Sequence, residues 1–99
     1  MTSNPVPMTQ SSGNVFEDLG FSRKEAENLR IRSELMISIR KRIEELGLTQ
    51  EEAARRMRVR QPRVSDLFCG KIGRFSTDAL INMAASLNLS IHMTFDKTA

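Results

Sequence analysis

The sequence predicts an all-α domain of about five helices that ends in one β-strand. Two capping boxes, one formed by Ser22 and Glu25 and the other by Thr49 and Glu52, each mark a helix start. In each box the hydroxyl accepts from the amide three residues on, and the carboxylate reaches back. Apolar residues at helical spacing follow both boxes. Residues 89–95 alternate strictly between apolar and polar side chains, as a half-buried strand does.

Composition sets the limits of the fold and of the partners. The 99 residues suffice for one domain with a small core, and the net charge of +3 permits nucleic-acid binding without requiring it. A single cysteine, Cys69, excludes an intramolecular disulfide and indicates a reducing compartment, so we expect a cytoplasmic protein. We expect its thiol to be buried or partly covered. No apolar run approaches the roughly 20 residues of a membrane span, and no signal-peptide stretch is expected.

The N-terminal part divides into two segments. Residues 1–14 are polar and uncharged with two prolines, a composition that predicts a disordered tail. Residues 15–21 then combine two acids with four large apolar side chains. Two interpretations are open: a short element that caps the bundle, or a docking segment that orders on binding a partner protein. The four apolar residues are Val15, Phe16, Leu19 and Phe21.

A long helix is expected from Ser22 to Leu46, because no proline or glycine interrupts this stretch. Its main apolar stripe follows helical spacing, and three further apolar residues partly off the stripe widen the surface toward a second contact. We expect residues 40–42, which are all basic, to form a solvated face. The stripe consists of Leu29, Met36, Ile39, Ile43 and Leu46, and the residues beside it are Ile31, Leu35 and Ile37.

Two short helices separated by a tight turn are expected next. The first runs from Thr49 and buries Ala53, Ala54 and Met57, and the two small alanines let another helix approach closely. Residues 58–60 form the turn. The second helix carries Pro62 in its first turn, where no N–H is needed, buries Val64 and Leu67, and ends at Gly70.

After the second short helix we expect a loop and a last helix that packs against the bundle. Ile72 and Phe75 should tuck under the helices, while Lys71 and Arg74 stay outside. Ser76 or Thr77 caps a last helix, which Asn88 ends by adopting a left-handed conformation. The buried side of this helix should consist of Ala79, Leu80, Met83, Ala84 and Leu87.

The alternating segment 89–95 needs a pairing partner. An unpaired strand leaves its backbone donors and acceptors unsatisfied, and the same strand of a second copy, antiparallel across a two-fold axis, is the simplest solution. Pairing with residues 14–16 of the same chain is the second possibility. The side chains expected at the dimer interface are Leu89, Ile91, Met93 and Phe95.

Positive charge is concentrated in the two short helices and the loop that follows them. Between Arg55 and Arg74 the chain has seven basic residues and one acid, Asp66. The second helix places polar side chains on its open face, and such side chains read base edges: glutamine can pair with adenine, and arginine with guanine or a phosphate. A helix-turn-helix that binds DNA is therefore expected.

The residues LTQEEAARRMRVRQPRVSDLFCGK resemble the helix-turn-helix of the Cro/repressor (Xre) family. The chain is more narrowly similar, over roughly residues 15–95, to small antitoxins of the HigA kind, in which one C-terminal strand follows this domain. The resemblance implies a lambda-repressor-like bundle over residues 22–88, a dimerisation strand over 89–95 and a tail over 96–99. One departure is Arg58, where the family often has glycine. The turn must therefore either take positive φ at this arginine, at a cost of about 1 kcal/mol, or open slightly.

The function implied by the resemblance is transcriptional repression as a homodimer on double-stranded DNA. The narrower similarity implies an antitoxin that silences a small RelE/HigB-type ribonuclease toxin. A phage-type regulator without a toxin and a protein-interaction adaptor on the same fold are the alternatives. No cofactor, metal site or catalytic set is expected, and His92 is interpreted as structural. The residues expected at the DNA are Gln50, the counterpart of the family's phosphate-clamping glutamine, with Arg60, Gln61, Pro62, Arg63, Ser65, Asp66, Lys71 and Arg74.

Overall fold

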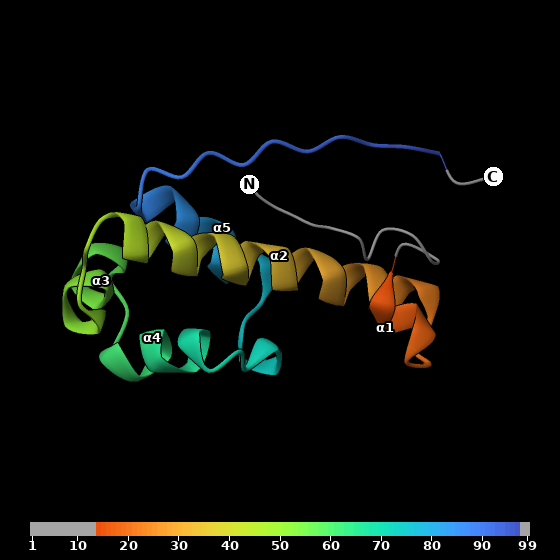
Figure 1. The fold of residues 1–99 in the computed structure, drawn as a ribbon, viewed down its shortest axis with the longest axis horizontal. Helices are drawn as coiled ribbons and strands as arrows, with labels where there is room; N and C mark the ends of the chain where they lie inside the picture. Colours follow the sequence, from red (N-terminus) through yellow and green to blue (C-terminus); the bar gives the residue numbers. More distant parts are fainter. Residues whose placement is uncertain (1–13, 98–99) are drawn as a thin grey trace.

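A computed structural model describes residues 14–97, which form five α-helices and one 3-10 turn (Figure 1). This confirms the predicted all-α architecture. Apart from Asn14, the predicted disordered tail lies outside the described residues, as do residues 98–99 of the predicted C-terminal tail. In chain order the elements are α1 (Val15–Asp18), α2 (Arg23–Glu45), α3 (Gln50–Met57), α4 (Gln61–Phe68), η2 (Ile72–Arg74) and α5 (Thr77–Ser86).

The predicted capping boxes start α2 and α3. The Ser22 hydroxyl accepts from the Glu25 amide at 3.2 Å, and the Glu25 carboxylate accepts from the Ser22 amide at 3.2 Å. At α3 the corresponding distances are 3.1 Å from the Glu52 amide to the Thr49 hydroxyl and 2.8 Å from the Thr49 amide to the Glu52 carboxylate. This backbone hydrogen bond lowers the pKa of Glu52. Local sequence therefore fixes both helix starts.

The core lies between the C-terminal half of α2 and the helices α3, α4 and α5, which cover it (Figure 1). The predicted stripe of α2 is confirmed at Met36, Ile39 and Ile43, which are buried. It is wrong at Leu29, which is only half-buried, because α3 to α5 pack against the other half of α2. Leu35, expected beside the stripe, is buried instead.

The turns between helices use left-handed backbone where the sequence predicts it. Arg58 has φ 58° and ψ 44°, so the turn after α3 takes positive φ at an arginine. Gly70 (φ 72°) follows α4, and Asn88 (φ 58°) follows α5. The Ser76 hydroxyl caps α5 by accepting from the Ala79 amide at 3.1 Å. Phe75 is buried below these turns, as expected.

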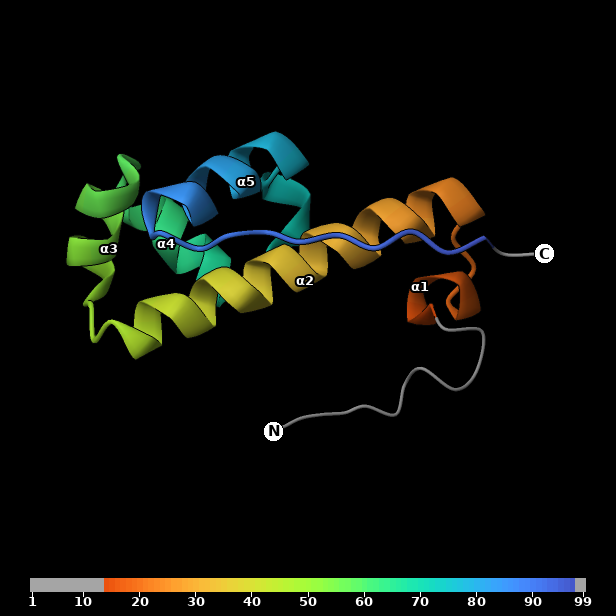
Figure 2. The ribbon, with the colours of Figure 1, turned by 90° about the horizontal axis from the view of Figure 1, so that it is seen from above.

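Helix α1 packs beside the start of α2 at the end of the molecule away from α3 (Figure 2). The Asn14 side chain caps it by accepting from the Phe16 amide at 3.0 Å. This helix overturns the second possibility for residues 89–95, pairing with residues 14–16, because the backbone of Val15 and Phe16 is helical. Phe16 is half-buried and meets Phe21 edge to face at 6.3 Å, whereas Val15, Leu19 and Phe21 are exposed.

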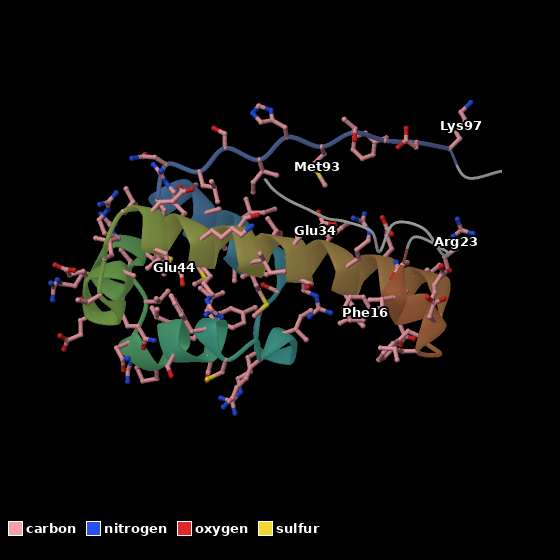
Figure 3. All side chains as sticks on the ribbon, viewed as in Figure 1. Phe16, Arg23, Glu34, Glu44, Met93 and Lys97 are labelled. Atoms are coloured by element: carbon pink, nitrogen blue, oxygen red, sulfur yellow. The ribbon has the colours of Figure 1, made fainter. Side chains whose placement is uncertain are left out.

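After α5 the chain runs extended along α2 as far as residue 97 (Figures 1 and 2). Within residues 14–97 no β-strand forms, so residues 89–95, predicted as a dimerisation strand, run as an extended segment. Leu89 packs against the core, and the side chain of Met93 points from this segment toward α2 (Figure 3). Among the described helices, none has both the length and the apolar character needed to cross a bilayer.

Candidate nucleic-acid interface

Helices α3 and α4 pack against each other through small and apolar side chains. Ala53 and Ala54 of α3 are buried, and Val64 and Leu67 of α4 face them from the shared core. The turn between the helices occupies residues 58–60, as predicted. The pair is thus a helix-turn-helix, in which α4 takes the position of the DNA-reading helix.

The open face of α4 lies opposite its buried side. Gln61, Ser65 and Cys69 follow one another at intervals of four residues and therefore share this face. Gln61 and Pro62 are exposed, and Ser65 is half-buried. Cys69 is also exposed, so the expectation of a covered thiol is wrong. The four-residue spacing of Cys69 from Ser65, and of Ser65 from Gln61, is the sequence signal that would have predicted this exposed position.

A hydrogen bond joins the first residues of α3 and α4. The Gln61 side-chain nitrogen (Nε2) donates to the Gln50 side-chain oxygen (Oε1) at 2.8 Å. Gln61 keeps one N–H and its carbonyl oxygen for a base edge, while Gln50 stands at the positive end of the α3 dipole, which favours an anion. The two glutamines can therefore bind a base and a neighbouring phosphate together.

Four exposed arginines precede α4 in the chain. Arg60 is the residue before the helix, is exposed, and makes no side-chain capping bond. Arg55, Arg56 and Arg58 on α3 and the turn are exposed as well. The predicted cluster of positive charge therefore lies on the surface of α3 and of the turn that leads into α4. Such a surface attracts a phosphate backbone.

Arg63 is predicted as a reading residue, but the structure places it against the following loop. Its side chain is half-buried, and its guanidinium carbon lies 4.4 Å from the ring centroid of Phe75. Its Nη1 donates to the carbonyl oxygen of Arg74 at 2.6 Å. Arg63 therefore points toward the loop after α4 rather than out from the open face.

Asp66 sits between the two predicted phosphate contacts. Its side chain is 17% exposed, and its carboxylate lies 3.5 Å from the Lys71 nitrogen and 3.4 Å from Arg74 Nη1. The side chains of Lys71 and Arg74 are themselves largely exposed. The carboxylate thus brings the two cations together at the end of α4, where both remain open to an anion.

Besides Arg40, whose Nη1 donates to the Phe68 carbonyl at 3.3 Å, two further structural arginines of α2 are missing from the predicted set. Arg32 of α2 donates from Nη1 to the carbonyls of Ile72 and Phe75, each at 3.2 Å. Arg42 donates from Nε to the carbonyl of Leu87 at 3.0 Å, so the expected solvated face at residues 40–42 is wrong at this residue. Both side chains join elements far apart in the chain, and no local pattern marks such contacts.

Metal-binding side chains were the other kind of site to consider in the described part of the chain. Residues 14–97 hold no group of three His, Cys, Asp or Glu side chains that could bind a metal ion, and His92 is exposed on the extended segment. A protein-family profile described as "Helix-turn-helix domain" matches residues 15–95. No curated protein matches the chain. Domains of this type are typical of non-enzymatic, DNA-binding regulators.

Proposed function

Because the chain belongs to the helix-turn-helix domain family, we propose that it is a sequence-specific transcriptional repressor that places α4 in the major groove of DNA. The observation that carries this proposal is the open face of α4, where Gln61 is exposed and hydrogen-bonded to Gln50, together with four exposed arginines in the segment 55–60 that leads into this helix. A helix of this kind enters the groove with its N-terminal residues against the base edges.

The proposed contacts divide into bases and phosphates. Gln61 is the first candidate for a base, since a glutamine amide matches the donor and acceptor pair of adenine. Arg60 and Ser65 are next, by their positions in the first two turns, whereas Arg63 and Asp66, which were also expected at bases, contact the loop after α4 instead. Gln50, Lys71 and Arg74 are candidates for phosphate oxygens, which fix register without reading sequence.

We further propose that the protein acts as a homodimer through residues 89–95. Ile91, Met93 and Phe95 are exposed along the extended segment, and a cleft of about 390 Å³ lies between this segment and α2. Antiparallel pairing with a second copy would satisfy the backbone and cover these side chains. The two α4 helices would then read half-sites about one helical turn, roughly 34 Å, apart.

The test begins with selection of binding sites from random duplex DNA by the full chain. Fluorescence anisotropy then compares the selected duplex with an unrelated duplex of equal length. Gln61→Ala should lower the affinity for the selected duplex about 5- to 150-fold, as loss of a bidentate base contact does. The affinity for the unrelated duplex should not change. Asn82→Ala, which removes an exposed amide from α5, is the matched control. Equal binding by Gln61→Ala would contradict its reading role.

We propose more narrowly that the protein is an antitoxin. This proposal rests on the resemblance to the HigA kind and on an exposed apolar and acidic surface at α1, at the end of the molecule opposite α4. Val15, Leu19 and Phe21 are exposed on and after α1, beside the acids Glu17 and Asp18. This surface lies far from α4 (Figure 1). An acidic and apolar surface would suit a basic toxin of the RelE/HigB type, with the outer face of α2 as the other candidate for docking.

Co-expression with a toxin encoded in the adjacent gene tests the antitoxin proposal. A chain lacking residues 1–21 should fail to neutralise the toxin, whereas a chain lacking residues 1–13, which keeps Asn14 and α1, is the control for truncation. Unimpaired neutralisation by the shorter chain would exclude docking at α1. Absence of a neighbouring toxin gene would favour a phage-type regulator. Retained function after charge reversal at Arg60 and Arg63 would favour an adaptor.

A further inference from the structure

The loop between α4 and α5, residues 71–75, carries both candidate phosphate contacts, Lys71 and Arg74. It is short and contains η2, whose backbone is joined by the bond from the Arg74 amide to the Lys71 carbonyl at 3.0 Å. The Lys71 amide also donates back to the Asp66 carbonyl of α4 at 3.1 Å. The direction in which the two cations point therefore depends on how this loop is held.

Arginines from two different helices hold the carbonyl groups of this loop. Arg32 of α2 donates to Ile72 and Phe75, each at 3.2 Å, and Arg63 of α4 donates to Arg74 at 2.6 Å. Hydrogen bonds from a charged donor are stronger than neutral ones. Three carbonyl groups of the loop are thereby held relative to α2 and α4.

Phe75 anchors the loop from below. Its side chain is 1% exposed in the core, and the guanidinium of Arg63 stacks on its ring at 4.4 Å from the centroid. A planar guanidinium can stack on a ring and donate to a carbonyl at the same time, whereas a lysine ammonium cannot reproduce that geometry. Arg63 would have to leave both partners to reach a base edge.

Asp66 completes the arrangement from the side of α4. Its mostly covered carboxylate lies within 3.5 Å of Lys71 and 3.4 Å of Arg74. Both cations remain exposed on the outer side. The contacts of Arg63 and Asp66 are thus directed at the loop, while Gln61 and Ser65 lie on the open face.

We propose that Arg32 and Arg63 are positioning residues that hold the 71–75 loop so that Lys71 and Arg74 grip phosphates beside the groove, and that Arg63 reads no base. The proposal rests on the proposed DNA-binding function. It separates the residues that contact DNA from those that position the contacting residues. Arg32 provides the matched test, because it belongs to α2, on the buried side of α4, where it cannot reach a base.

The experiment compares Arg63→Lys and Arg32→Lys, which keep the charge, on the selected and the unrelated duplex over a range of salt concentrations. Both variants should lose affinity for both duplexes by a common factor of about five to ten, as expected when one or two exposed phosphate contacts are lost. The ratio of the two affinities should stay within about twofold of wild type. The slope of log K against log salt should fall by up to about two, since each phosphate contact contributes about 0.9.

A second measurement asks whether the arginines act through the two cations. In a Lys71→Ala, Arg74→Ala background, Arg63→Lys and Arg32→Lys should change DNA affinity by less than about twofold, because their targets are gone. Phe75→Leu, which keeps an apolar anchor but removes the ring face under Arg63, should reproduce the uniform loss. This variant also covers the case in which Arg63→Lys fails to fold, as judged by circular dichroism.

Three outcomes would overturn the inference. One is an Arg63→Lys variant that loses affinity for the selected duplex alone, as a base-reading residue would. Another is unchanged affinity and slope in both single variants. The third is a five- to tenfold loss of DNA affinity on adding Arg63→Lys or Arg32→Lys to the Lys71→Ala, Arg74→Ala variant. Failure of the wild-type chain to select any DNA would instead contradict the proposed function itself.

Discussion

The two ends of the molecule differ in how far their apolar side chains are buried. At the compact end, the C-terminal half of α2 with α3, α4, η2 and α5, residues such as Ile39, Val64 and Leu80 are fully buried. At the extended end, formed by α1, the N-terminal half of α2 and residues 89–97, several large apolar side chains stay exposed. Leu19 is 69% exposed and Phe95 is 87% exposed.

This difference indicates separate tasks for the two ends. The compact end closes its own core and leaves a polar and basic surface, which suits DNA. The extended end leaves its apolar surface uncovered, and an exposed apolar patch on a small protein marks a surface for another protein. A second copy along residues 89–95 and a toxin at α1 are the proposed occupants.

The strongest test of the comparison is a matched pair of phenylalanine truncations. Phe75→Ala at the compact end should lower the free energy of unfolding by about 3–5 kcal/mol, because it leaves a cavity in the core. Phe95→Ala at the extended end should change it by less than about 0.5 kcal/mol at concentrations where the protein is monomeric. Urea unfolding measures both values. Comparable losses in the two variants would refute the division into a closed and an open end.

The second prediction concerns self-association of the extended end. Met93→Asp should weaken the proposed dimer by about 2 kcal/mol, or about thirtyfold in its dissociation constant, because it places a charge where an apolar side chain should be covered. Thr94→Asp, on the alternate side of the same segment, is the control and should have a much smaller effect. Sedimentation equilibrium gives both constants. A monomeric wild-type chain would remove the basis for this prediction.

The third prediction uses the two capping boxes, one at each end. Thr49→Ala should lower the free energy of global unfolding by about 1 kcal/mol, since α3 is part of the cooperative core. Ser22→Ala should mainly loosen the first turn of α2, because local opening there does not expose the core. Amide hydrogen exchange separates the two cases. A global loss of equal size in Ser22→Ala would show that the extended end unfolds together with the core.

The smallest expected effect is at the left-handed turn of the compact end. Arg58→Gly should stabilise the protein by about 0.5–1 kcal/mol, because glycine adopts the observed φ of 58° without strain. Arg55→Gly, inside α3, should destabilise it by about 1 kcal/mol. Thermal unfolding at fixed protein concentration measures the opposite shifts. A loss of stability in Arg58→Gly would mean that the arginine side chain supports the turn.

The sequence predicts the elements whose signals are local. Ser22 with Glu25, Thr49 with Glu52, and the left-handed positions at Arg58 and Asn88 are each defined within a few residues, and the structure confirms them. The buried pair Val64 and Leu67 follows from helical spacing alone. These features need no knowledge of the rest of the fold.

Contacts between distant segments could not be predicted in the same way. Arg32 binds a loop some 40 residues further along the chain, and Arg63 turns toward Phe75 because the loop returns beneath α4. Leu29 is only half-buried because the bundle covers the other half of α2. Each of these outcomes depends on where α5 and the loop pack, and spacing along one helix carries no such information.

Footprinting of the selected DNA with hydroxyl radicals tests most directly whether the exposed side of α4 enters a groove in two copies. We expect two protected stretches on one face of the duplex, related by two-fold symmetry, with centres about one helical turn, roughly 34 Å, apart. At a protein concentration that just saturates the site for wild type, Gln61→Ala should weaken the protection of both stretches together. Protection of one unsymmetrical stretch, or a wild-type footprint in the Gln61→Ala variant, would contradict this account.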